Sequence, residues 1–131
     1  MELCPGGDLE KLIDKVVASG KVFSEFFVTD IMTKIVLALM HLRGNRIVHR
    51  DLKPSNIVFK DLSHTELRLI DFGVTRIFGQ KTDSFGQFTV CGTFGYMAPE
   101  VLADQSGDES SGREYSYPVD VFAFGVIAYQ L

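Results

Sequence analysis

The sequence contains few of the residues that cross-link small domains or bind zinc. Its two cysteines, Cys4 and Cys91, form no C-x-x-C pair. This number and spacing exclude a disulfide framework and a cysteine-based zinc site. Because disulfides are rare in reducing compartments, the shortage of cysteine agrees with an intracellular protein, in the cytoplasm or, as an alternative, the nucleus.

The sequence also lacks a long apolar run and an excess of basic charge. The longest apolar runs, residues 35–40 and 121–129, fall well short of the ~20 residues that a membrane-spanning helix needs. Residues 1–8 hold neither a basic stretch nor an apolar run, so no signal peptide is predicted. The net charge of −4 offers no basic surface to nucleic acid or to lipid headgroups. We therefore expect no nucleic acid and no membrane among the partners.

Apolar residues recur at helical spacing in two segments of the first third of the chain. Residues 8–18 predict a short helix that ends at Ser19-Gly20. A longer helix is expected after Ser24, because serine is a favourable N-cap residue. Gly44 stands where a C′ glycine would end that second helix.

The remaining segments predict a small hairpin and one more helix. Residues 57–59 and 67–70 are short apolar runs on either side of a polar loop, which indicates an antiparallel hairpin. Residues 104–116 are rich in Ser, Gly and acidic residues, as expected of a surface loop. Residues 119–131 are nearly all apolar and predict a helix that is buried on every side. The fold class expected from this pattern is mainly α (α+β).

Three short motifs carry the chemistry. Residues 49–56 read H-R-D-L-K-P-S-N, in which a carboxylate, a cation two residues later and a carboxamide share one polar loop. Residues 71–73 read D-F-G and supply a second hard oxygen ligand, and residues 98–100 read A-P-E. Transfer of a phosphoryl group needs such groups: a carboxylate to accept a hydroxyl proton, a cation near the phosphate and oxygen ligands for Mg²⁺.

In this order and at this spacing, the three motifs resemble the signature set of the protein kinase family. The resemblance extends over nearly the whole chain. It implies the C-terminal lobe of a kinase domain, made of helices with a small antiparallel hairpin, in which the N-terminal lobe is absent. Residues 1–131 would form a partial kinase domain, with a hinge at 1–8, a catalytic loop at 49–56 and an activation segment at 71–100.

The resemblance assigns the chemical roles residue by residue. Asp51 resembles the catalytic base and Lys53 the cation that contacts the γ-phosphate of ATP. The hydroxyl of Thr93 would bridge these two side chains. Asn56 and Asp71 resemble the ligands of Mg²⁺. Lys53 and Thr93 are typical of serine/threonine kinases rather than of tyrosine kinases, so the expected substrate is a protein with a Ser or Thr acceptor.

The resemblance also assigns the nucleotide-binding groups, with ATP and Mg²⁺ as cofactors. The backbone of Glu2 and Cys4 would pair with the edge of the adenine, and Val58 would lie under its ring. Ser55 is placed among the nucleotide-binding residues. Asp8 would accept a ribose hydroxyl, although its position before a predicted helix fits an N-cap equally well.

Further residues would support the site. By the resemblance, Asp120 would accept backbone N–H groups of the catalytic loop. Independently of it, an acid in an apolar helix needs hydrogen-bond donors, because a buried acid without them is too costly. His49 is expected to pack under Phe72 rather than to act as a base. Thr89 stands where the family's activating phosphorylation commonly falls, and Arg50 would bind that phosphate.

Two functions remain open at this stage. The sequence contains no G-x-G-x-x-G loop and no V-A-I-K-like strand, and it opens and stops abruptly, so we expect part of a larger catalytic domain. One interpretation is an active serine/threonine kinase seen as a fragment that is inactive alone. The other is a catalytically inactive kinase-like binding or regulatory module. In either case the missing lobe or a partner would cover the exposed cleft. The intact Asp51, Asn56 and Asp71 favour the first interpretation.

Overall fold

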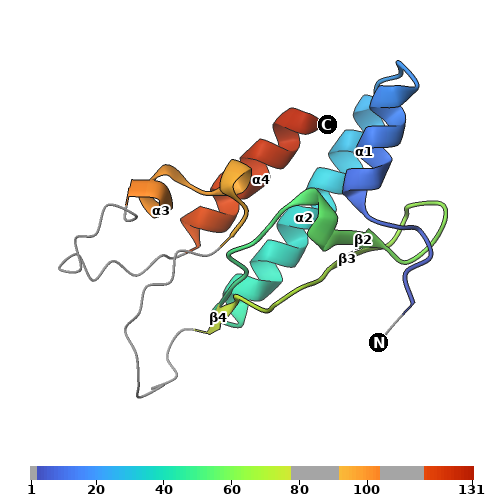
Figure 1. Ribbon diagram of the computed structural model, residues 1–131. Coiled ribbons are helices and arrows are strands. Elements are labelled where there is room, and N and C mark those ends of the chain that lie inside the picture. Colours follow the sequence, from blue (N-terminus) through green and yellow to red (C-terminus); the bar gives the residue numbers. More distant parts are fainter. Residues whose placement is uncertain (1–2, 78–91, 104–116) are drawn as a thin grey trace.

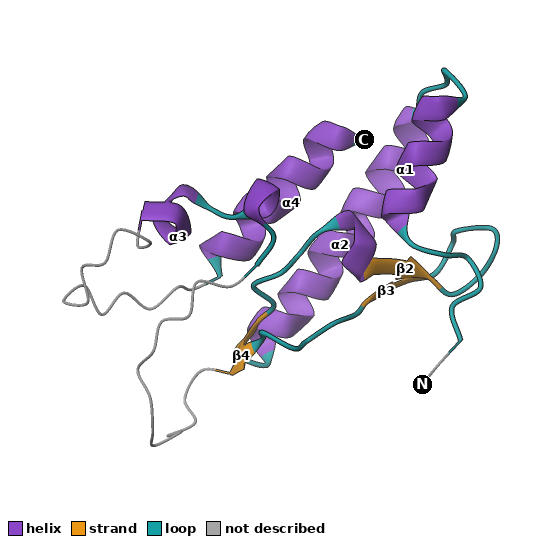
Figure 2. Ribbon diagram, viewed as in Figure 1, coloured by secondary structure: helices purple, strands orange, loops and turns teal. Residues whose placement is uncertain are grey.

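The computed structural model describes residues 3–77, 92–103 and 117–131 (Figure 1). Within these residues the helices are α1 (Leu9–Ala18), α2 (Glu25–Gly44), α3 (Pro99–Ala103) and α4 (Pro118–Gln130). The strands are β1 (Ile47–Val48), β2 (Ile57–Phe59), β3 (Leu67–Leu69) and β4 (Arg76–Ile77), and two 3₁₀ turns are η1 (Pro54–Asn56) and η2 (Phe94–Tyr96). Helices dominate, as the predicted mainly α (α+β) class requires (Figure 2).

Helix α1 begins and ends where the sequence predicts. Asp8 is its N-cap: the Oδ1 atom accepts the backbone N–H of Lys11 at 2.8 Å. The chain leaves the helix through Ser19 and Gly20, and Gly20 adopts a φ of 66°, a left-handed conformation that glycine tolerates. The N-cap interpretation of Asp8 is therefore confirmed.

Helix α2 begins as predicted but ends differently. Ser24 caps it, with its Oγ atom accepting the backbone N–H of Phe27 at 3.2 Å. The prediction that Gly44 ends the helix as a C′ residue is wrong, because Gly44 belongs to the last turn and Asn45 is the C-cap. The left-handed residue that follows is Arg46, with a φ of 59°. A residue other than glycine can adopt this conformation at a modest energetic cost, so the position of a glycine alone does not define the end of a helix.

The hairpin of β2 and β3 is confirmed. The two strands are antiparallel, with Ile57 opposite Leu69 and Phe59 opposite Leu67. A second antiparallel pair, β1 with β4, was not predicted, because each of its strands has only two residues. It places the start of the predicted catalytic loop, residues 49–56, beside the segment that follows the D-F-G motif.

Helix α4 forms where the apolar run predicts it, but the prediction that it is buried on every side is wrong for the described residues. Val119, Asp120, Ala123 and Ile127 face the interior. By contrast, 61% of Val121 and 95% of Tyr129 are exposed. A uniformly apolar sequence predicts a helix but does not determine which of its faces the neighbouring elements cover. The short helix α3 was not predicted, and the predicted loop at 104–116 lies outside the described residues.

Two groups of buried side chains hold the catalytic loop from both sides. The larger joins α1, α2, β2 and α4 through residues that include Leu9, Ile35 and Ile127, and it contains Leu52 of the loop itself. The smaller packs Val48 against Ala98, Val101 and Val119. Figure 1 shows α4 alongside α2, with α1 on the other side of α2. No helix in the described parts of the chain is long and apolar enough to span a membrane.

Candidate functional site

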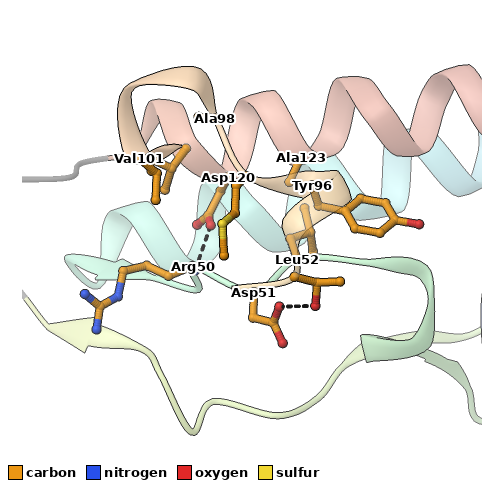
Figure 3. A pocket seen from close by; sticks show the side chains of 11 residues that line it. Arg50, Asp51, Leu52, Tyr96, Ala98, Val101, Asp120 and Ala123 are labelled. Atoms are coloured by element: carbon orange, nitrogen blue, oxygen red, sulfur yellow. Dashed lines mark hydrogen bonds between the residues drawn. The ribbon is translucent and has the colours of Figure 1, made fainter. Parts of the chain in front are cut away.

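The backbone of the catalytic loop is fixed by a buried carboxylate on α4. Asp120 is only 5% exposed, and its two carboxylate oxygens accept the N–H groups of His49 and Arg50, each at 2.9 Å. Figure 3 shows the bond between Asp120 and Arg50. Arg50 adopts a φ of 67°, a left-handed conformation that is unfavourable for residues other than glycine. The surrounding structure must therefore stabilise this conformation of the backbone. Burial raises the pKa of Asp120, while the two N–H donors act in the opposite direction. The predicted role of Asp120 in holding the loop is confirmed.

Four polar side chains of the predicted site form one hydrogen-bonded set. The Thr93 hydroxyl donates to Asp51 Oδ1 at 2.8 Å and accepts from Lys53 Nζ at 2.7 Å. Lys53 Nζ also lies 2.9 Å from Asp51 Oδ2. The Asn56 amide donates to the main-chain oxygen of Asp51 at 2.8 Å and to its Oδ2 at 3.1 Å. The bridge expected of Thr93 is therefore present.

The electrostatics of this set keep Asp51 in its charged form. Burial raises the pKa of the Asp51 carboxyl, but hydrogen bonds from Lys53, Thr93 and Asn56 and the charge of Lys53 outweigh it. The net effect holds the pKa of Asp51 below its ordinary value. A charged carboxylate can accept a proton, and here the Lys53 ammonium group lies 2.9 Å away.

The hairpin brings the two predicted metal ligands to the same end of the sheet. Asn56 comes directly before β2 and Asp71 two residues after β3, and Ile70 N–H donates to the Asn56 carbonyl at 3.0 Å. Since the Asn56 amide nitrogen faces Asp51, its Oδ1 atom remains as the side-chain acceptor. Among the described residues, no group of three His, Cys, Asp or Glu could hold a metal ion. One carboxylate and one amide oxygen fit Mg²⁺, which typically takes few protein ligands and completes its shell with water and phosphate.

His49 packs as expected. Its ring lies 5.0 Å from the ring of Phe72, and its Nε2 atom is 3.0 Å from the carbonyl oxygen of Ile70. Because His49 is fully buried, these contacts determine how the chain enters the D-F-G motif. Asp71 follows with a φ of 62°, a second residue in the left-handed region at the edge of the site.

The predicted hinge lies along β2. Gly6 N–H donates to Phe59 O at 3.1 Å, and Phe59 N–H donates to Gly7 O at 2.8 Å. An ideal Cβ at Gly6 would lie 2.2 Å from the main-chain oxygen of Asp61, so only glycine allows this close approach. Asp8 pairs with Val58 as an isolated bridge, and the carbonyl oxygen of Cys4 accepts the N–H of Gly7 at 3.3 Å in the same segment. Asp8 Oδ2 also contacts Lys11 Nζ at 2.7 Å.

The predicted site residues thus fall into two groups. Asp51, Lys53, Asn56 and Thr93 are joined directly by hydrogen bonds, and Ser55 sits among them in η1. Cys4, Asp8 and Val58 lie along the hinge, and Asp71 is placed at the end of the hairpin. Glu2 and Thr89 lie outside the described residues.

Two features of the site were not anticipated. The first is the hydrogen bond from the Asn56 side-chain amide to Asp51, which leaves the amide oxygen for a metal. The second is the close approach of Gly92 to the catalytic loop. In the sequence, the sign of this close approach is that a glycine stands directly before Thr93. The cavity between the loop, η2 and α4 (Figure 3) measures about 20 Å³, room for about one water, so ligands must bind outside it.

Comparisons with known proteins identify the family. The protein kinase domain family matches residues 1–131. The chain is 41% identical to myosin light chain kinase A of Dictyostelium discoideum, over all of the chain and 40% of that protein. It is 40% identical to serine/threonine-protein kinase Nek2 of Mus musculus, over all of the chain and 28% of that protein. A third relative, calcium-dependent protein kinase 6 of Plasmodium berghei, is 37% identical over all of the chain and 8% of its own length. The chain therefore spans well under half of these relatives, and it belongs to the protein kinase family.

Proposed function

We propose that the protein containing this chain is a serine/threonine protein kinase that transfers the γ-phosphate of ATP to Ser or Thr hydroxyls of proteins. The observation that carries this proposal is the hydrogen-bonded set of Asp51, Lys53 and Thr93 beside the metal-binding candidates Asn56 and Asp71. The family membership supports it, and the relatives are named as kinases.

In this proposal each side chain has a distinct task. Asp51 accepts the proton of the acceptor hydroxyl as its oxygen bonds to phosphorus and the bond to the ADP oxygen breaks. Lys53 places a positive charge beside the transferred group. Thr93 fixes the positions of Lys53 and Asp51 relative to each other through its two hydrogen bonds. Asn56 and Asp71 would hold Mg²⁺, which neutralises charge on the phosphate oxygens when bound.

The finer assignments are part of the same proposal. Residues 1–131 would be the C-terminal lobe of the domain, with residues 1–8 as hinge, 49–56 as catalytic loop and 71–100 as activation segment. The backbone of Glu2 and Cys4 would pair with the adenine and Val58 would lie below it. Asp8 would accept a ribose hydroxyl, and Ser55 would lie near the nucleotide. The half-buried position of Val58 next to the hinge supports this arrangement.

The test is an Asp51→Asn substitution in the full-length protein. We expect the phosphotransfer rate to fall by roughly 10²–10⁴-fold, as for the loss of a general base. Asp30→Asn is a matched control that should leave the rate unchanged, because Asp30 lies on the surface of α2, where it pairs with Lys34 of the same helix.

Nucleotide binding, measured by calorimetry, separates the proposal from its alternative. We expect the Asp51→Asn protein to bind Mg²⁺–ATP nearly as well as the unaltered protein. An unaltered protein that binds nucleotide but transfers no phosphate to any Ser/Thr substrate would indicate the kinase-like binding module instead. A near-normal rate in Asp51→Asn would remove Asp51 from the proposed role.

A further inference from the structure

Gly92 lies against the main chain of the catalytic loop. A Cβ atom added at this position would come within 2.9 Å of the carbonyl oxygen of Arg50 and 3.6 Å of two Met97 side-chain atoms. The φ of Gly92 is 122°, a conformation that residues with a side chain rarely adopt. A larger residue at position 92 must therefore displace either the backbone at Arg50 or the backbone of its own segment.

The catalytic loop is held in place by three hydrogen bonds. The N–H groups of His49 and Arg50 are both held by Asp120 at 2.9 Å, and Arg50 Nε donates to the Val74 carbonyl at 2.7 Å. A methyl group at position 92 would accordingly shift the segment of residues 92–98 rather than the loop.

The far end of that segment is fixed as well. Ala98 is 1% exposed and packs with Val101 and Val119 in the smaller buried group. The Tyr96 hydroxyl donates to Gln130 Oε1 at 3.0 Å and so ties η2 to α4. With its end at Ala98 anchored, the segment can yield mainly at Thr93, the residue directly after Gly92.

Thr93 has little tolerance for such a shift. Its hydroxyl lies 2.8 Å from Asp51 Oδ1 and 2.7 Å from Lys53 Nζ. Hydrogen bonds weaken steeply once their geometry departs from about 2.7–3.2 Å and near-linear alignment. We propose that Gly92 is a positioning residue for phosphoryl transfer, whose missing side chain lets Thr93 reach Asp51 and Lys53. This inference rests on the proposed function.

The experiment is a double-mutant cycle in the full-length protein, with Gly92→Ala, Thr93→Ala and the double variant. If Gly92 acts through Thr93, Gly92→Ala should lower kcat by about 10- to 100-fold, as for loss of charge-assisted hydrogen bonds, with the KM for ATP nearly unchanged. In the Thr93→Ala background, Gly92→Ala should change kcat by less than about twofold, because the Thr93 hydroxyl and its hydrogen bonds are already absent.

Gly95→Ala is the matched control. Gly95 belongs to the same segment, and an added Cβ there would meet no atom within 4 Å. It should keep both kcat and the thermal unfolding midpoint.

Each other outcome has one meaning. Equal effects of Gly92→Ala in both backgrounds, or an unchanged kcat, would overturn the positioning role. Failure of Gly92→Ala to fold while Gly95→Ala folds would also overturn it, because Gly92 would then serve the fold alone. The proposed function is judged separately, by the dependence of phosphate transfer on Asp51 in the unaltered sequence.

Discussion

At the scale of single residues, the orientation of the Asp51 carboxylate depends on groups far away in the sequence. Thr93, which donates to its Oδ1, is 42 residues further along the chain. The loop that carries Asp51 is held by Asp120, 71 residues from its partner His49. Because each contact restricts a different torsion, the carboxylate is set in place before any substrate binds, which is the condition for efficient proton transfer.

Arg50 gives a prediction at the same scale. Its guanidinium has five N–H donors, and Nε binds the Val74 carbonyl at 2.7 Å. We predict that Thr89, outside the described residues, is phosphorylated in the active protein and that its phosphate binds Arg50. A phosphate adds about −1.5 to −2 charges, which makes such hydrogen bonds strong.

Mass spectrometry of the active full-length protein should find phosphate on Thr89. Thr89→Ala should lower activity, and Thr82→Ala, at a less favourable place in the same segment, should do so much less. Full activity of Thr89→Ala would disprove the prediction.

Single residues also show what the sequence can and cannot determine. The motifs predict the chemical groups at Asp51, Asn56 and Asp71, because phosphoryl transfer needs residues of these types. They do not give the hydrogen bond that the Asn56 side-chain amide donates to Asp51 or the tight approach of Gly92 to Arg50, since both depend on how the folded segments pack.

At the scale of elements, α4 serves the site through its first turn. Asp120 is one of its buried positions and satisfies two backbone donors of the loop. Asp120→Ala removes both acceptors, and each donor left without a partner should cost about 1–3 kcal/mol. We therefore expect a lower free energy of unfolding in urea and a reduced phosphotransfer rate.

Val121→Ala is the control on the same helix. Val121 is 61% exposed, so its truncation should change the free energy of unfolding by no more than about 0.5 kcal/mol. Equal stability of the two variants would mean that Asp120 does not hold the loop.

The elements were predictable where the signal is local. Asp8 and Ser24 cap α1 and α2 because a side-chain oxygen next to the first turn satisfies its N–H groups. The hairpin of β2 and β3 follows from two apolar runs around a polar loop. The pair β1 and β4 joins Val48 to Arg76 across the whole catalytic loop, and two-residue strands leave no periodicity to detect.

At the scale of the whole molecule, the candidate site stands at the boundary between the two buried groups, and apolar side chains are exposed on the side proposed to bind the nucleotide. Phe72 is 45% exposed, and Val58 is half-buried at the hinge edge. Apolar surface of this kind, next to polar groups that would contact a nucleotide, favours a covering element or a partner.

The last prediction concerns residues 1–131 as an isolated polypeptide, which should not transfer phosphate at a useful rate. In the proposed function these residues would supply a base, a cation and two metal ligands, but their sequence contains no glycine-rich loop and no strand lysine to cover the phosphates. Correct positioning of the reactants can lower the activation barrier by roughly 7–11 kcal/mol, so losing part of it should reduce the rate of phosphate transfer severely. We expect a poorly soluble or partner-dependent polypeptide that binds Mg²⁺–nucleotide weakly.

The assay incubates this polypeptide with labelled ATP, Mg²⁺ and a generic basic protein substrate, beside an Asp51→Asn copy that reveals contaminating kinases. Asp51 is the right position for the control, because its side chain is hydrogen-bonded to Thr93 and Asn56 within the candidate site. Asparagine has nearly the same shape and leaves the surrounding apolar contacts in place. Turnover near roughly 1 s⁻¹, the low end for kinases, that disappears in the Asp51→Asn copy would show that these 131 residues suffice for catalysis.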